Sequence, residues 1–164
     1  NVGLTAAWVG TYDLKDGSTV YDAVGSYNFS STVARPLPEW KANGTLSWSK
    51  DNHRAFMMVR YIDEVDEDIP AATAGFFKAV TALAGNQSTA NDMADGKIDS
   101  MVTVDLQYNY NFGETAFLSD SNLTVGLQNV FDEKPPVVSY ITAYDPTLHD
   151  GRGRLFILRA SASL

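Results

Sequence analysis

Apolar and polar residues alternate along residues 98–112, which read IDSMVTVDLQYNYNF. The even-numbered positions from Ile98 to Phe112 are apolar or aromatic except for Ser100, and the odd-numbered positions from Asp99 to Asn111 are polar except for Met101. Successive side chains of a β-strand point to opposite faces, so a period of two indicates a strand. The pattern predicts one long strand with an apolar and a polar face.

Five further stretches alternate in the same way: 4–12, 40–49, 53–62, 122–131 and 154–164. The apolar line of each, which begins at Phe156 in the last one, contains no Asp, Glu, Lys or Arg. The opposite lines carry Asn, Thr, Ser and Gln, together with the charged residues Lys41, Arg54, Arg60, Asp99, Asp105 and Arg159. A helical period fits none of the stretches as well. The sequence therefore predicts an all-β fold, an antiparallel sheet of about six strands.

The connections between these strands alternate between short and long. Residues 50–52 form one short turn, and the segment GETAFLSD (113–120) forms another. The other three connections, about 15–39, 63–97 and 132–153, exceed the usual length of loops in compact domains. On successive hairpins this order places the short turns at one end of the sheet and the long loops at the other. Such an asymmetry is typical of an outer-membrane β-barrel.

Aromatic residues are placed near the predicted strand ends. A bilayer has two interfaces, each of which favours Trp and Tyr, so a barrel carries two aromatic girdles around an aliphatic band. The predicted lipid-facing girdle residues are Tyr12, Trp40, Trp48, Tyr61, Tyr108, Tyr110 and Phe112. On this hypothesis the apolar face contacts lipid and the polar face lines a wet interior.

The overall composition excludes several classes of protein. The 164-residue chain has no cysteine and a formal net charge of -8, which argues against disulfides, thiolate metal sites and nucleic acid as a partner. It has no apolar run of about 18 or more residues, which a transmembrane helix needs. A barrel strand needs only about 9–11 alternating residues. Because bacterial barrels have at least about eight strands, we expect the chain to be an incomplete piece of a larger transmembrane barrel.

A soluble β-sandwich would also alternate, with its apolar face turned inward. Two features argue against it. The predicted strands are longer than the usual length of about 5–6 residues, and their polar faces carry few Lys and Glu residues. The sandwich remains the alternative fold.

The last forty residues resemble a known family. The segments NLTVGLQNVFDEKPPVV (122–138) and YDPTLHDGRGRLFILRASASL (144–164) are similar to the closing hairpin of TonB-dependent outer-membrane receptors. The residues that carry the resemblance are Asn122, Asn129, Val130, Phe131, Asp132, Pro135, Pro136, Tyr144, Asp145, Gly153 and Arg154. Segments 37–63 and 98–112 also look typical of the family. Members usually end on an aromatic residue, whereas this chain ends on Leu164.

The resemblance implies a function and partners. The chain would supply the last strands of a barrel of about 22 strands in the outer membrane of a Gram-negative bacterium. The receptor would take up a siderophore-iron complex, cobalamin, haem or an oligosaccharide, powered by the inner-membrane TonB complex through a plug domain that this chain lacks. The other implied partners are the remaining barrel strands, the barrel-assembly machinery and outer-membrane lipid. A passive porin-type channel and a soluble binding module are the alternatives.

Charged residues on the polar lines are candidates for ligand contact. Arg54, Arg60, Asp99 and Asp105 fall on strands that we expect to be adjacent, with Arg60 near Asp99 and Asp105 lower down. They form either a charge network on the inner wall or a direct ligand contact.

Three loop features extend the set of candidates. Residues 71–85 read as a short helix that ends near Gly85, with Phe76, Phe77, Val80 and Leu83 on one side. This side either enters the barrel mouth or packs against neighbouring loops. Tyr144 and His149, in the last long loop, complete the candidates.

The acidic run 63–68 is a weak candidate for a metal site. Carboxylates suit hard cations, and Asp63, Asp66 and Asp68 are the candidate ligands, but the spacing is not that of an EF-hand. A solvated acidic loop is the alternative. The two histidines, His53 and His149, belong to opposite ends of the predicted sheet, so no Ser/His/Asp set can assemble. We therefore expect neither an enzyme nor a cofactor.

Overall fold

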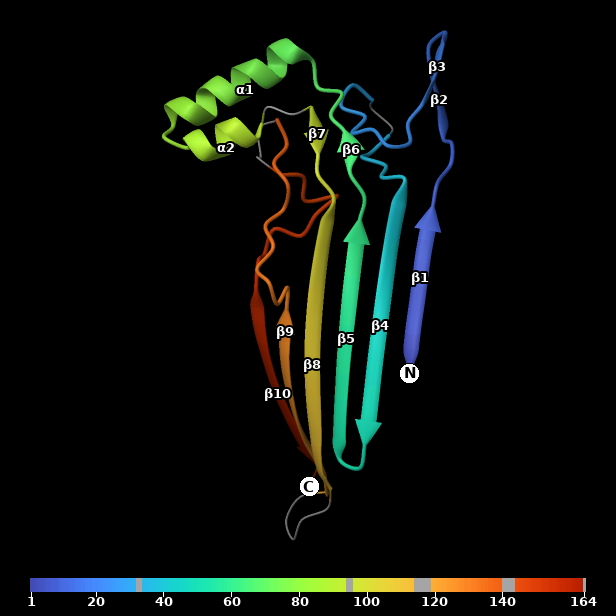
Figure 1. Cartoon of the computed structure of the whole chain (residues 1–164), viewed down its shortest axis with the longest axis vertical. Coiled ribbons are helices and arrows are strands. Elements are labelled where there is room, and N and C mark those ends of the chain that lie inside the picture. Colours follow the sequence, from blue (N-terminus) through green and yellow to red (C-terminus); the bar gives the residue numbers. More distant parts are fainter. Residues whose placement is uncertain (32–33, 94–95, 114–118, 140–143, 164) are drawn as a thin grey trace.

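The computed structural model describes residues 1–31, 34–93, 96–113, 119–139 and 144–163. Its main feature is a 6-stranded antiparallel sheet in which each long strand lies beside the next one along the chain (Figure 1). These strands are β1 (Val2–Trp8), β4 (Trp40–Lys50), β5 (His53–Ile62), β8 (Met101–Gly113), β9 (Ser119–Gln128) and β10 (Leu155–Ser163). The sheet is not closed, because β1 and β10 each pair on one side only among the described residues. The predicted all-β, antiparallel arrangement is confirmed.

The ends of two strands differ from the prediction. The first strand stops at Trp8 instead of residue 12, so Tyr12 lies in a loop, where its N–H donates to Asp22 Oδ1 at 2.9 Å. The fifth strand stops at Gln128, and Phe131 lies in a turn, where it is 71 % exposed. In both places backbone N–H groups bond to partners outside the sheet, Tyr12 to Asp22 and Asp132 to the Asn129 carbonyl, and the strand ends.

The prediction for residues 98–100 is wrong. Ile98 does not extend the apolar face of β8; it belongs to the short strand β7 (Lys97–Ile98), which pairs with β6 (Val65–Asp66). Ile98 and its partner Val65 are 0 % and 1 % exposed. Burial of both aliphatic side chains in a core stabilises this pairing more than continuation of an exposed strand would.

The register confirms that the two faces of the sheet differ. Leu46 on β4 pairs with Met57 on β5, which pairs with Leu106 on β8 and then Leu127 on β9. The next row of the same face contains Trp48, Ala55, Tyr108, Val125 and Leu158. Polar rows alternate with these on the other face. Among the described residues nothing buries the apolar face, and Leu4, Phe156 and Leu158 are 80 %, 77 % and 74 % exposed.

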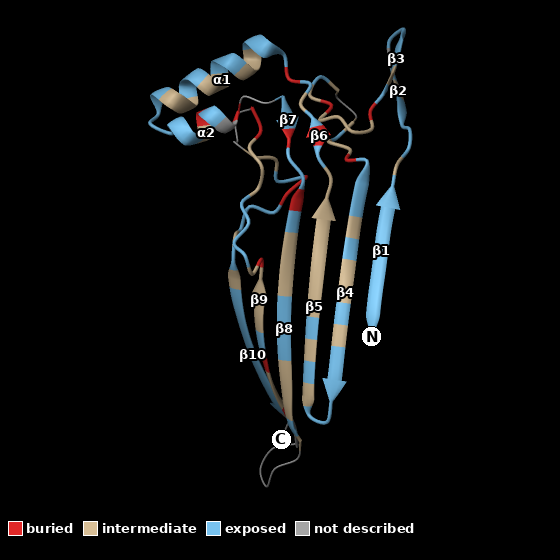
Figure 2. Cartoon of the chain, viewed as in Figure 1, coloured by how far each residue is buried: buried red, intermediate tan, exposed pale blue. Residues whose placement is uncertain are grey.

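The buried core of the chain lies in its long loops. Its central cluster consists of Val65, Ile69, Ile98, Val138 and Leu148, against which Tyr27, Phe29, Ile62 and Ala74 pack. Apart from Ile62 at the end of β5, these residues come from all three long connections, which therefore fold together at one end of the sheet. We call this unit, the described residues of 9–39, 63–100 and 129–154, the loop cap. Figure 2 shows the buried residues gathered in the loop cap, with the long strands mostly exposed or half-buried.

The loop cap contains secondary structure of its own. The predicted helix is confirmed as α1 (Ala71–Leu83), after which Gly85 adopts a φ of 88°. A second helix, α2 (Gln87–Asp92), and the hairpin of β2 (Asp13–Asp16) and β3 (Thr19–Asp22) were not predicted. Neither described helix combines the length and the hydropathy that crossing a bilayer requires.

The apolar side of α1 does not enter the core as a unit. Phe76, Val80 and Leu83 are 62 %, 45 % and 88 % exposed, and Phe77 is half-buried. Most of this stripe therefore faces outward instead of packing against neighbouring loops.

Candidate functional site

The strongest polar contact on the sheet joins β5 to β8. Arg60 Nη2 lies 2.7 Å from Asp105 Oδ2, and the Asp105 side chain is 15 % exposed. The other oxygen of this carboxylate accepts the backbone N–H of Asn129 at 2.9 Å. Asp105 thus connects β5, β8 and the turn that follows β9.

The predicted proximity of Arg60 to Asp99 is wrong. The register places Arg60 opposite Thr103, so the acidic residue two positions further on the same face is Asp105. Asp99 precedes β8 and is exposed. Alternation alone does not define the register of two strands, and a shift of a few residues changes the partner of Arg60.

Residues of the C-terminal motif hold the turn that follows β9 and tie it to the residue before β10. Asn129 and Asp132 adopt positive φ values of 50° and 57°. The Asn129 side chain bonds both the N–H and the carbonyl of Glu133, at 2.9 Å and 2.8 Å. Asp132 Oδ1 accepts the N–H of Arg154 at 2.9 Å, next to Gly153 with a φ of 68°. These motif residues therefore form hydrogen bonds that stabilise the backbone of the turn. Leu164 lies outside the described residues.

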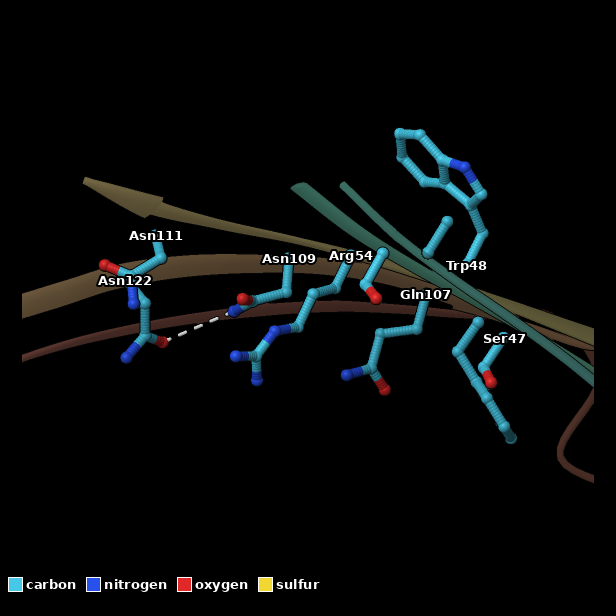
Figure 3. Close-up of a pocket in the computed structure, with 10 residues that line it drawn as sticks. Ser47, Trp48, Arg54, Gln107, Asn109, Asn111 and Asn122 are labelled. Carbon is cyan, nitrogen blue, oxygen red and sulfur yellow. Dashed lines mark hydrogen bonds between the residues drawn. The ribbon is translucent and has the colours of Figure 1, made fainter. Parts of the chain in front are cut away.

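A polar hollow of about 640 Å³ lies on the polar face near the short turns. Its polar lining comprises Ser47, Ser49, Arg54, Gln107, Asn109, Asn111 and Asn122. Arg54 and Gln107 project from one side of the sheet and Trp48 from the other (Figure 3). Asn109 Nδ2 donates to Thr124 Oγ1 at 2.8 Å, and Arg54 forms no ion pair with any described residue. The hollow offers hydrogen-bonding groups and one positive charge.

A second, smaller cavity of about 290 Å³ lies on the same face beneath the loop cap. Lys41, Asn43 and Arg60 contribute from β4 and β5, and Thr103 contributes from β8. Asp150, Arg152 and Gly153 line it from the loop that leads into β10. The cavity is therefore bounded by strands on one side and by the loop cap on the other.

His149, a candidate ligand contact, is buried in the loop cap. It is 2 % exposed, and neither ring nitrogen has a hydrogen-bond partner among the described residues. Burial lowers the pKa of His149 from 6.5 to about 4, against the opposing effect of Asp145, and the positive charge of Lys41 lowers it further. The imidazole is therefore neutral at pH 7 and packs inside the loop cap instead of facing solvent.

The remaining loop candidates lie at separate places. The rings of Phe76 and Phe77 are 5.3 Å apart on α1. Tyr144 packs over Gly151, where an added Cβ would lie 2.5 Å from the ring carbon Cζ. Among the eight candidate contacts the structure joins Arg60 to Asp105 and Phe76 to Phe77.

The acidic run connects loops. Asp63 accepts the hydroxyl of Tyr61 at 2.5 Å, and Asp68 accepts the N–H of Phe29 at 2.8 Å. Lys97 Nζ lies 2.6 Å from Glu64 and 3.8 Å from Asp66, and the bond to Glu64 raises the pKa of Lys97. Asp63, Asp66 and Asp68 thus have different partners. In the described part of the chain, no three His, Asp or Glu side chains are grouped to hold a metal ion.

Aromatic residues border the apolar face at both ends. At the short-turn end Trp48 and Phe112 are 50 % and 51 % exposed, and the rings of Tyr110 and Phe112 lie 4.8 Å apart. At the loop end Trp8 and Trp40 are 6.0 Å apart, and Trp8 Nε1 donates to Glu39 at 2.8 Å. Trp8 was not among the predicted girdle residues, although it shares the apolar line of Leu4 and Ala6.

Known proteins offer no guide to this site. Comparisons of the chain with models of protein families, with curated proteins and with solved structures found no match.

The two histidines lie far from each other in the fold: His53 shares a 2.5 Å hydrogen bond with the Tyr108 hydroxyl near the short turn, whereas His149 is in the loop cap. The residues that line the polar hollow and the cavity beneath the loop cap can bind a ligand through hydrogen bonds and charge.

Proposed function

We propose that the chain forms part of the transmembrane β-barrel of a TonB-dependent receptor in the outer membrane of a Gram-negative bacterium. One observation carries the membrane part of this proposal: a single-layer sheet has a continuous apolar face that no described residue buries. Aromatic residues border this face at both ends, and the opposite face carries amides, hydroxyls and charges. The TonB-dependent part rests on the resemblance of residues 122–164 to the closing hairpin of that family.

Hydrocarbon is the environment that suits the apolar face. The face includes a shallow apolar groove of about 690 Å³, to which Leu46, Met57, Leu106, Val125 and Leu158 contribute. Apolar area gains about 25 cal/mol per Å² on leaving water. Large, continuous exposed apolar patches are typical of surfaces that contact a membrane or another protein. Acyl chains would cover all rows of the face equally, without the need for a partner of matching shape.

The unpaired edge strands β1 and β10 argue that further strands complete the sheet. Unpaired N–H and C=O groups of β1 and β10 would each cost several kcal/mol in hydrocarbon. In a receptor barrel the remaining strands satisfy them, and the polar face then lines the interior. A plug within that interior would receive energy from the inner-membrane TonB complex.

The loop cap suits an extracellular position. Its three connections share one core, so it presents a folded surface above the barrel mouth instead of separate loops. The ligand would be of the siderophore-iron, cobalamin, haem or oligosaccharide class. It would first meet the loop cap and then the polar wall beneath it.

Cysteine accessibility tests the membrane part. The chain has no native cysteine, so a single introduced thiol reports on one position. Leu106 and Gln107 are neighbours on β8 with opposite faces. In outer-membrane vesicles we expect Gln107→Cys to react with a hydrophilic maleimide and Leu106→Cys to react only after detergent is added. Equal reaction at both positions before detergent addition contradicts the proposal.

Energy dependence tests the TonB part. The intact receptor is expressed in cells, and uptake of labelled ferric siderophores, cobalamin, haem and oligosaccharides is measured with and without a protonophore. We expect uptake of one ligand class that the protonophore abolishes. Uptake that persists in its presence favours a passive porin-type channel instead.

A further inference from the structure

We propose that the cavity beneath the loop cap binds a small oxyanion through Lys41 and Arg60. The inference deepens the proposed function, because it names the chemistry of the ligand that the receptor wall would contact. Anion binding itself does not require the sheet to lie in a membrane, so the two proposals can fail separately.

The cavity is built by the strand register and by one loop. Two polar-face rows form its strand side: Lys41, Ile62 and Met101 in one row, and Asn43, Arg60 and Thr103 in the next. The loop before β10 closes the other side with Asp150, Arg152 and Gly153. Asp132 fixes this loop through its bond to the Arg154 N–H at 2.9 Å. Both sides of the cavity are therefore positioned by hydrogen-bonded backbone.

The lining is basic although the chain is acidic. The chain has a formal net charge of -8, yet Lys41, Arg60 and Arg152 line the cavity against one carboxylate, Asp150. Arg152 neutralises Asp150, with Nη2 and Oδ2 2.5 Å apart. Lys41 forms no ion pair with any described residue. A positive charge thus remains where an anion can enter.

The charges of Lys41 and Arg60 act on residues of the loop cap. The positive charge of Lys41 contributes to the lowered pKa of His149. The bonds to Arg152 lower the pKa of Asp150 to about 2, and the positive charge of Arg60 contributes to this shift. The charge of Arg60 therefore acts on a residue of the cavity lining, and that of Lys41 acts on a buried residue of the loop cap.

Arg60 has donors that are weakly used. One nitrogen, Nη2, binds Asp105, but Nη1 faces the sulfur of Met58 at 3.5 Å and Nε faces the Thr103 hydroxyl at 3.4 Å. A thioether is a weak acceptor, whereas guanidinium bonds to an oxyanion are short and strong. The amides of Asn43 and Gln128, also in the lining, can donate to further oxygens.

The size of the cavity limits the ligand. A volume of about 290 Å³ lies near the lower end of the range of small-molecule pockets. It suits a small oxyanion, or the anionic group of a larger ligand, with carboxylate or phosphate oxygens. Arg60 and Arg152 are paired with Asp105 and Asp150, so Lys41 supplies the unbalanced positive charge and Arg60 supplies further donors.

Calorimetric titration tests the site. The full chain is purified in detergent micelles and titrated at pH 7.5 with succinate, with inorganic phosphate and with neutral succinamide. We expect saturable binding of a dianion but not of succinamide. Lys41→Gln should weaken binding about tenfold, the effect of losing one charge-assisted hydrogen bond. The control Lys134→Gln, an exposed lysine outside the cavity lining, should bind as the unaltered chain does.

Each outcome has a defined meaning. Binding of either dianion that Lys41→Gln weakens supports the site, and the tighter of the two identifies a carboxylate or a phosphate group. No saturable binding, equal binding of succinamide, or equal effects of the two lysine substitutions overturns it. A thermal unfolding scan serves as the control that the Lys41→Gln variant is folded. Anion binding together with a water-accessible Leu106→Cys would keep this site and contradict the membrane proposal alone.

Discussion

Arg60 on β5 and Asp105 on β8 form an ion pair at 2.7 Å, and the same carboxylate holds the Asn129 N–H at the end of β9. One side chain therefore links two strands and the turn that follows β9, where the sheet meets the loop cap. The Arg60 side chain is 42 % exposed, so solvent weakens the charge term. The backbone bond to Asn129 does not depend on that charge.

Substitutions of Asp105 should separate these two contributions. We expect Asp105→Asn, which can still accept the Asn129 N–H, to lower the free energy of unfolding by about 1 kcal/mol, and Asp105→Ala by about 2 kcal/mol. Urea unfolding in detergent micelles, followed by tryptophan fluorescence, measures both. The matched control Asp99→Ala should change stability by less than about 0.5 kcal/mol. If Asp99→Ala were as destabilising as Asp105→Ala, the assigned ion-pair partner would be wrong.

Ile98→Ala should destabilise the loop cap without disrupting the sheet. The side chain is 0 % exposed in the loop-cap core, and truncation of such a residue costs about 2–5 kcal/mol. Hydrogen exchange should become faster for backbone amides near Val65, Ile69 and Val138, and remain slow in β5 and β8. The control Leu83→Ala, at a position that is 88 % exposed, should leave exchange unchanged. Faster exchange throughout the sheet would show that loop cap and sheet unfold together.

The loop cap should lose stability as the pH falls from 6.5 to about 4. The pKa of His149 is lowered to about 4 in the folded chain, so folding favours the neutral imidazole. Its contribution is complete above the unfolded pKa of 6.5 and declines as the unfolded chain takes up a proton. At one pKa unit per 1.36 kcal/mol, the loss by pH 4 is about 3 kcal/mol.

Thermal unfolding at pH 7 and pH 4.5 measures this effect. His149→Leu should remove most of the difference between the two pH values. The comparison variant Leu148→Ala should lower stability by a similar amount at both, because the deleted group does not titrate. An unchanged pH dependence in His149→Leu would assign the effect to other groups.

A charge should be tolerated on one face of β8 and not on the other. In a lipid bilayer we expect Leu106→Arg to lower the free energy of unfolding by about 2–4 kcal/mol, because the guanidinium would lie in hydrocarbon. Gln107→Arg, one residue further along the strand, should change it much less. Urea unfolding in lipid vesicles measures both variants. Equal costs would contradict the assignment of the apolar face to lipid.

The period of two predicted the strands but not where they end. A strand with one apolar and one polar face reveals itself locally, so six strands and the positions of Trp48, Leu106 and Gln107 followed from alternation alone. Strand ends depend on contacts with distant residues. Ile98 shares the parity of the apolar line, yet pairing with Val65 places it in a different sheet.

The candidate site was predicted less completely than the fold. Arg60 and Asp105 were identified because charges on a polar face are conspicuous, but their pairing required the register. The cavity with Lys41 and Arg152 was not predicted, since one residue lies at the start of β4 and the other in the loop before β10. The turn formed by Asn129 and Asp132 was visible only as a family motif, without its hydrogen bonds.

The sequence by itself determined which side chains share a face, because that depends only on backbone geometry from one residue to the next. Tertiary structure alone decided that the three long loops share one core, that Asp105 instead of Asp99 meets Arg60, and that His149 is buried. Those outcomes depend on residues far apart in the sequence, whose contacts arise from the free energy of packing the whole chain.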